Sequence, residues 1–221
     1  MLRILIADDH EVARRGIRSI LESHPGWEVC EEAKDGREAV EMAARTHPEV
    51  ILLDIAMPNL NGLEAARQIL DASPDVAILI LTMHDSDQTI REVLRAGARG
   101  FLLKSDAGRD LVSAFEALEQ KRTFFTTKVS QIVFEGFLDR RDPAQINRSS
   151  IELSHDLLTT REREVIQLLA EGKTSKEVAV TLNLSVKTAE THRTNLMRKL
   201  GLHSVADLTR YAVRNGIVHV F

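Results

Sequence analysis

The sequence predicts an α/β domain built on a doubly wound parallel sheet, followed by a small all-α domain of four helices. In the first half, short aliphatic runs alternate with helical stretches, the pattern of successive βα units. From residue 157 onward the segments are helical in pattern and none is a convincing strand. The length of 221 residues also exceeds the common domain size of about 100 to 150 residues, which favours two domains.

Four aliphatic runs in the first domain have the composition of strands buried on both faces. They span residues 2–7, 50–53, 77–81 and 101–103. The helices predicted between and after them span residues 11–23, 36–46, 61–72, 86–96 and 106–120. Asp-Gly, His-Pro and Ser-Pro pairs punctuate these stretches. Five βα units predict a flavodoxin-like strand order.

Polar side chains follow the aliphatic runs where each predicted strand ends: Asp8 and Asp9, Asp54, Thr82 and Lys104. Ligands bind parallel sheets at the carboxyl ends of the strands, so these groups are expected to converge. Converging carboxylates repel one another unless a cation offsets their charge. Mg²⁺ prefers oxygen ligands, typically one or two carboxylates and a phosphate oxygen. The pattern therefore predicts a site that holds Mg²⁺ and a phosphoryl group, with Lys104 and Thr82 contacting the anion.

Each of these residues also has a structural interpretation. A strand-end Asp is often a helix cap or a turn former, Thr82 is an ordinary strand residue, and Lys104 alone is an ordinary surface lysine. The order of the residues, their placement at strand ends and the Met57-Pro58 pair after Asp54 favour the functional interpretation.

A linker is predicted between the domains, giving a first domain at 1–121, a linker at 122–154 and a second domain at 155–221. Residues 126–138 have helical spacing of Val129, Ile132, Val133 and Phe137, which predicts an amphipathic helix with a docking face. Residues 139–154 are polar, contain a Pro and lack periodicity, as expected of a flexible tether.

Charge divides unevenly along the chain. Residues 1–155 hold 19 Lys and Arg against 26 Asp and Glu, a net charge of −7, and residues 156–221 hold 10 against 7, a net charge of +3. The overall charge of −4 thus conceals a basic second domain, which suits binding to nucleic acid.

The second domain has the pattern of a helix-turn-helix. Its predicted helices run from Thr159 or Thr160 to 171, then over 175–182, 186–200 and 204–215, with a tight turn at 183–185. The third helix carries four basic residues and a single acid, Glu190. Such charges alone describe a solvated face, but the preceding turn favours a helix that enters the major groove of DNA.

Both halves resemble known bacterial domains. The Asp8-Asp9 pair, the segment DIAMPNLNG around Asp54, Thr82, and Phe-Leu-Leu-Lys at 101–104 resemble the receiver domain of response regulators, over roughly residues 1–121. The segments LTTREREVIQLLAEGKTSKEVA and LSVKTAETHRTNLMRKLGL resemble the LuxR-type DNA-binding domain, over roughly 155–218. Together they resemble response regulators of the NarL/FixJ family.

This resemblance implies roles for the strand-end residues. Asp54 is the expected phosphoryl acceptor from a sensor histidine kinase, with Thr82 and Lys104 contacting the phosphoryl group. Phe101 takes the place of a switch aromatic that is commonly Tyr. The expected Mg²⁺ ligands are Asp8, Asp9, Asp54 and the backbone carbonyl of Ala56.

The resemblance also implies how DNA is read. Glu190, Thr191 and Thr194 are expected to contact bases. The expected contacts to the DNA backbone are Lys187, Thr188, Arg193, Arg198 and Lys199. Phosphorylation is expected to release and dimerise the DNA-binding domains on double-stranded DNA with paired half-sites. Independently of the resemblance, His192 lies among apolar positions and is expected to pack structurally.

A transcription regulator is therefore predicted rather than an enzyme. Two alternatives stay open: a Mg²⁺-dependent phosphohydrolase that uses Asp54 as a transient nucleophile, and a pseudo-receiver that is never phosphorylated. No apolar run approaches the roughly 20 residues of a membrane span, and no signal sequence is recognised at the N-terminus. The single Cys30 fits a reducing compartment, and a cytoplasmic location is predicted.

Overall fold

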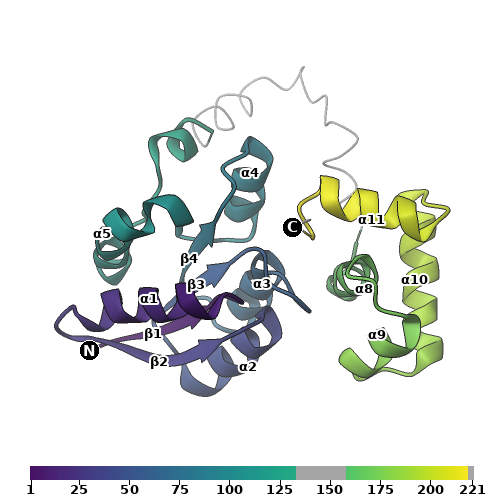
Figure 1. Ribbon diagram of the computed structural model, residues 1–221, viewed down its shortest axis with the longest axis horizontal. Helices are drawn as coiled ribbons and strands as arrows, with labels where there is room; N and C mark the ends of the chain where they lie inside the picture. The colour runs from purple at the N-terminus through teal and green to yellow at the C-terminus, as the bar shows by residue number, and fades with distance from the viewer. Residues whose placement is uncertain (133–157, 219–221) are drawn as a thin grey trace. The chain divides into compact units, whose positions relative to one another are not determined.

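The computed structural model describes residues 1–132 and 158–218, which belong to two compact units (Figure 1). A parallel sheet with surrounding helices forms the first unit, and the described part of the second unit is helical. The division between the units, after Asp142, falls outside the described ranges. Over both described ranges, no helix has the length and apolar composition required to cross a membrane.

Five parallel strands form the sheet of the first unit, in the order β2-β1-β3-β4-β5. Strands β1, β3 and β4 are buried almost throughout, which accounts for their continuous aliphatic sequences. The order is that of flavodoxin-like sheets and confirms the predicted doubly wound fold. The strands are β1 (Leu2–Ala7), β2 (Trp27–Ala33), β3 (Val50–Asp54), β4 (Ala77–Thr82) and β5 (Gly100–Leu103).

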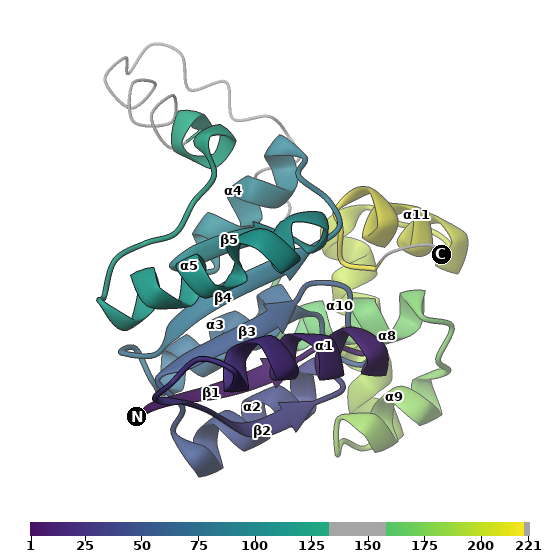
Figure 2. The same ribbon diagram turned by 60° about the vertical axis from the view of Figure 1, so that its left-hand side comes forward.

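Helices cover both faces of this sheet: α1 (Glu11–Glu22), α2 (Gly36–Thr46), α3 (Gly62–Ala72), α4 (Asp87–Arg95) and α5 (Ala107–Glu119). In Figure 2, α1 and α5 lie in front of the sheet and α2, α3 and α4 lie behind it. Successive strand residues point to opposite faces, so Ile4 and Leu5 belong to separate apolar cores. Some predicted helices are slightly longer than observed because they include capping residues such as Asn61 and Ser86.

After α5 the chain turns back and runs beside β5. The Phe101 N–H donates to the Phe124 carbonyl at 2.9 Å, and the Phe124 N–H donates to the Arg99 carbonyl at 3.0 Å. Phe124 thereby forms a parallel bridge with Gly100 at the edge of the sheet. We call residues 123–132 the return segment.

Within the return segment, residues 127–132 are helical and lie inside the predicted helix at 126–138. Val129 and Ile132 are buried in the same apolar core as α4, as a docking face requires. The other two apolar positions of the predicted helix, Val133 and Phe137, lie outside the described residues, as does the predicted tether at 139–154.

The second unit consists of α8 (Thr160–Ala170), α9 (Ser175–Thr181), α10 (Val186–Leu200) and α11 (Val205–Arg214). These four helices enclose one apolar core and confirm the predicted all-α fold. Thr159 and Thr174 each begin a helix with a capping box, in which the Thr hydroxyl and a Glu three residues later satisfy backbone N–H groups reciprocally. Asn183, with φ of 52°, makes the tight turn between α9 and α10.

Candidate functional site: an acidic pocket and a basic helix

Strand register aligns the predicted site residues along one edge of the sheet. In the pairing of β1 with β3, Asp8 follows the last paired residue and so lies next to Asp54 at the end of β3. Thr82 lies one position beyond the β4 partner of Asp54, and Lys104 lies one position beyond the β5 partner of Thr82. Four residues separated by up to 96 positions therefore converge because neighbouring strands end together.

Lys104 joins the two buried carboxylates of this pocket. Its Nζ lies 2.8 Å from Asp8 Oδ2 and 2.8 Å from Asp54 Oδ2. Asp8 is 0% exposed, Asp54 is 2% exposed, and the Lys104 side chain is 15% exposed. Two buried carboxylates require a cation, but one ammonium leaves an excess negative charge, to which Asp9 at the pocket rim adds.

Burial and charge act in opposite directions on this pair. Burial raises the pKa of Asp54, the Lys104 ammonium opposes that increase, Asp8 adds to it, and the net direction is upward. Burial lowers the pKa of Lys104, but its hydrogen bonds and charge interactions with Asp54 and Asp8 outweigh burial and raise the pKa overall. Lys104 is therefore held in its charged form between the acids.

The loop after Asp54 is fixed by its tight turn. The ideal Cβ of any residue replacing Gly62 would lie 2.0 Å from the Asp54 carbonyl oxygen, so only glycine fits there. The Gly62 N–H donates to the Ile55 carbonyl at 3.0 Å. The Ala56 backbone N–H donates to the Asp54 carboxylate and favours its charged form. This loop consequently holds the Asp54 side chain and the backbone of Ala56 next to each other.

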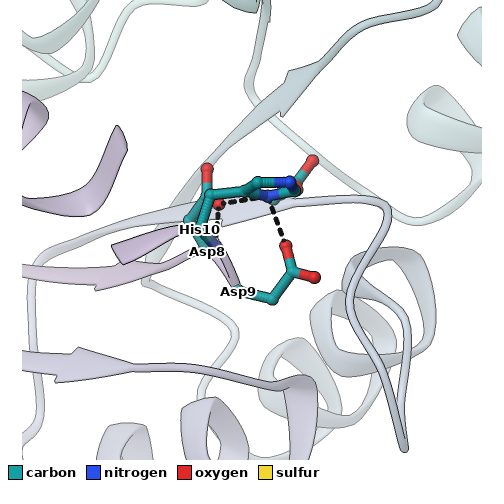
Figure 3. Close-up of side chains that lie close together, drawn as sticks. Asp8, Asp9 and His10 are labelled. Atoms are coloured by element: carbon teal, nitrogen blue, oxygen red, sulfur yellow. Dashed lines mark hydrogen bonds and ion pairs between the residues drawn. The ribbon is translucent and has the colours of Figure 1, made fainter. Parts of the chain in front are cut away.

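His10, to which the sequence assigned no role, lies close to Asp8 and Asp9 (Figure 3). Its Nδ1 lies 2.7 Å from Asp9 Oδ1 and 3.3 Å from Asp8 Oδ1, and its backbone N–H donates to Asp8 Oδ1 at 2.8 Å. Four residues each offer one ligand atom here, and these four atoms lie within 4.8 Å of one another: Asp8, Asp9, His10 and Asp54. Adjacency to the Asp8-Asp9 pair was the available signal for His10.

Thr82 and Phe101 are both buried beside the pocket strands. The Thr82 hydroxyl oxygen accepts a hydrogen bond from the His84 N–H at 3.2 Å, which ties the end of β4 to the loop before α4. Phe101 lies in the apolar core that also contains Val129 of the return segment. The aromatic side chain at the predicted switch position is thus packed inside the domain.

The exposed face of α10 carries most of the residues predicted to contact DNA. Ala189 and Leu196 face the core of the second unit, and Thr188 and Arg193 are half-buried. The exposed residues are Lys187, Glu190, Thr191, Thr194, Arg198 and Lys199. The hydroxyl groups of Thr191 and Thr194 donate to helix carbonyls at 2.9 Å each. His192 is half-buried.

Lys199 has a partner inside the second unit. Its Nζ lies 2.7 Å from Glu162 Oε2, and this carboxylate also accepts hydrogen bonds from the backbone N–H and hydroxyl of Thr159 at 2.8 and 3.0 Å. The contact joins α10 to the start of α8 and competes with the phosphate contact predicted for Lys199, which stays a prediction. The Thr-x-x-Glu spacing of the capping box was the available signal for Glu162.

Two protein families match this chain. Residues 4–116 match the response regulator receiver domain, and residues 156–212 match the luxR family of bacterial regulatory proteins. The chain belongs to the NarL/FixJ family of response regulators. This response regulator therefore combines a receiver domain with a LuxR-type DNA-binding domain and belongs to a family of transcription regulators.

Relatives match along the entire length of this response regulator. The transcriptional regulatory protein LiaR of Bacillus subtilis is 36% identical over 219 residues, which cover 99% of this chain and 100% of LiaR. The oxygen regulatory protein NreC of Staphylococcus carnosus is 35% identical and covers 98% of this chain and 99% of its own. Among solved structures, the RcsB–DNA complex matches with a TM-score of 0.56 and 27% identity, over 97% of this chain and 98% of RcsB.

Proposed function

We propose that a sensor histidine kinase phosphorylates this response regulator on Asp54, and that phosphorylation releases and dimerises its DNA-binding domain. The observation that carries the proposal is the position of Lys104 Nζ, 2.8 Å from both Asp8 and Asp54. A single cation shared by two buried carboxylates leaves negative charge for a further cation to offset. It also puts an ammonium beside the nucleophile, where the oxygens of a phosphoryl group require positive charge.

The donor atoms of the pocket fit Mg²⁺. Carboxylate oxygens of Asp8, Asp9 and Asp54 are the hard ligands that this ion prefers, and the Ala56 carbonyl would complete the protein's share of the ligands. When bound, Mg²⁺ supplies positive charge that stabilises the phosphoryl oxygens during transfer.

The residues of the pocket divide the chemistry of transfer between them. An Asp54 carboxylate oxygen attacks the phosphorus of the kinase phosphohistidine, the P–N bond breaks, and the imidazole of the kinase leaves. Lys104 then pairs with a phosphoryl oxygen of the acyl phosphate, and the Thr82 hydroxyl donates a hydrogen bond to another. Hydrolysis of the acyl phosphate returns Asp54 to its carboxylate form and ends the signal.

The second domain binds double-stranded DNA as paired half-sites, one for each DNA-binding domain of a homodimer. The residues that contact bases are Glu190, Thr191 and Thr194. A chromosomal DNA target implies that the protein acts in the cytoplasm. The residues that contact the DNA backbone are Lys187, Thr188, Arg193, Arg198 and Lys199. Support comes from RcsB of Salmonella enterica serovar Typhimurium, whose structure was solved bound to promoter rprA in the presence of the phosphomimetic BeF₃⁻.

Intact-mass measurement after incubation with acetyl phosphate and Mg²⁺ tests this function. The wild-type protein should gain one persistent phosphoryl adduct, Asp54→Asn should gain none, and Asp9→Ala should gain it much more slowly. Asp75→Asn is the matched control, because Asp75 is exposed and precedes β4 at the opposite end of the sheet. Rapid turnover without an adduct would indicate a phosphohydrolase, no reaction would indicate a pseudo-receiver, and an adduct on Asp54→Asn would move the acceptor elsewhere.

A further inference from the structure

A single lysine ties the return segment to the loop that leads into α4. Lys128 Nζ donates to the Asp85 backbone carbonyl at 2.5 Å. It also lies 3.3 Å from Asp85 Oδ2 and 3.7 Å from Asp87 Oδ1. Three oxygens from one short stretch of chain therefore surround one cation, whose side chain remains partly exposed.

This charged contact lies beside an apolar one. Val129 and Ile132 are buried in the core that contains Ile90 and Val93 of α4 and Phe101 of β5. The apolar residues join the return segment to this core, and Lys128 joins it to the loop before α4. The chain's own residues 123–132 therefore contact the edge of β5 through Phe124 and the start of α4 through Lys128.

The same loop begins at the phosphoryl pocket. Thr82 ends β4 in the pocket, and its hydroxyl oxygen accepts from the His84 N–H at 3.2 Å. Asp85, whose carbonyl receives the Lys128 ammonium, is the next residue. Residues 83–87 are exposed. Two hydrogen bonds, joined by the peptide bond between His84 and Asp85, therefore connect the pocket to the return segment.

We propose that Lys128 acts as a phosphorylation-sensitive latch on the α4–β5 surface, holding the return segment until a phosphoryl group on Asp54 draws Thr82 toward it. This inference rests on the proposed function. A phosphoryl oxygen is a strong acceptor for the Thr82 hydroxyl, because hydrogen bonds to ionised groups are roughly twice as strong as neutral ones. Movement of Thr82 shifts the His84 amide and, through it, the Asp85 carbonyl. A partly exposed ion pair contributes little energy, so a small shift is enough to weaken it.

Hydrogen exchange of the full chain, with and without beryllofluoride and Mg²⁺, measures the latch directly. Beryllofluoride is the probe for the phosphoryl group, and backbone protection at residues 54–62 reports its binding. In the wild-type protein, its binding should speed exchange at residues 127–132 by about two- to fivefold, the factor that loss of a partly exposed ion pair gives. In Thr82→Val, which lacks the hydroxyl, the return segment should stay protected.

Variants of the lysine separate the latch from simple packing. Lys128→Met keeps an unbranched apolar stem and should show the faster exchange without beryllofluoride, with little further increase when it is added. Lys128→Arg keeps the cation and should respond as the wild type does. The matched control is Lys34→Met, which removes an exposed lysine that pairs with Glu38 at 3.1 Å on another part of the domain.

Each outcome decides the proposal. Protection at residues 54–62 together with unchanged exchange at 127–132 would overturn the latch and leave the proposed function intact. The latch is also overturned if the return segment of Lys128→Met exchanges at the same rate as that of Lys34→Met. Absence of any protection at residues 54–62 would count against phosphorylation of the pocket itself, and the latch would fall with it.

Discussion

Replacing Lys104 by Met should destabilise the receiver domain in a way that Mg²⁺ reverses. The variant keeps an apolar stem of similar length but leaves Asp8 and Asp54 buried without the ammonium that lies 2.8 Å from each. Removing one partner of a buried ion pair costs roughly 3–5 kcal/mol. Because Lys104 is partly exposed at the pocket mouth, we expect the lower end, about 3 kcal/mol, or more than a hundredfold in the folding equilibrium.

Urea unfolding followed by the fluorescence of Trp27 measures this loss in the full chain. Trp27 is the only tryptophan of the sequence and is buried on β2, so its signal reports the receiver domain alone. Adding Mg²⁺ at about 100 times its dissociation constant should return about 2.7 kcal/mol. Lys34→Met, which removes only a surface ion pair, should change stability by less than about 1 kcal/mol. A loss below about 1 kcal/mol for the Lys104 variant, or no recovery with Mg²⁺, would refute this account of the pocket.

Three further changes probe other parts of the chain. Gly62→Ala should cost at least roughly 1–3 kcal/mol in urea unfolding, because its methyl group would meet the carbonyl of the preceding strand end, whereas Gly16→Ala has open space and should be neutral or stabilising; equal stabilities would contradict this. Burial raises the pKa of Glu162, but hydrogen bonds from Lys199 and Thr159 outweigh burial, and the net pKa lies below the usual glutamate value. The Glu162 carboxylate therefore stabilises the domain above the ordinary glutamate pKa of about 4.3, and this stabilisation is lost as the pH falls below it. Glu162→Gln should therefore lower the unfolding free energy of the DNA-binding domain by roughly 1 kcal/mol at about pH 7, and a gap that does not narrow at low pH would refute the assignment. In salt titrations on cognate and scrambled duplexes, Arg198→Ala should lower the salt slope by about one and Thr191→Ala should change preference at one base position by roughly 1–3 kcal/mol; the reverse pattern would mean that α10 is oriented differently on DNA.

The sequence was most informative where a charged residue directly follows a buried strand. A charged residue directly after an aliphatic run has to lie at the end of the sheet, and parallel register then brings Asp8, Asp54 and Lys104 together. Strand β2 was not located, because it lies at the edge of the sheet and reads WEVCEEA instead of an aliphatic run. Its Glu32 pairs with Arg14 and Arg18 of α1, contacts whose partners are set by packing between elements.

Contacts between distant segments could not be read from the sequence. Lys199 and Glu162 are 37 residues apart, and Lys128 and Asp85 are 43 residues apart. In the sequence alone, neither lysine can be distinguished from an ordinary solvent-exposed lysine. Its partner is determined only when two helices pack, or when the return segment folds back, so periodicity and motif spacing carry no signal for either pair.

The bridge between Phe124 and Gly100 also bears on aggregation through the edge of the sheet. Strand β5 is the last strand of the sheet and reads GFLL, a short apolar sequence whose free backbone groups would be a template for pairing with another chain. The return segment occupies part of that template with its own backbone. A fragment cut at residue 121 would uncover the strand together with the apolar surface under Val129 and Ile132, and would be prone to edge-to-edge aggregation. A fragment that continues through residue 132 would keep this part of the sheet edge covered, so we expect it to aggregate less than the shorter fragment.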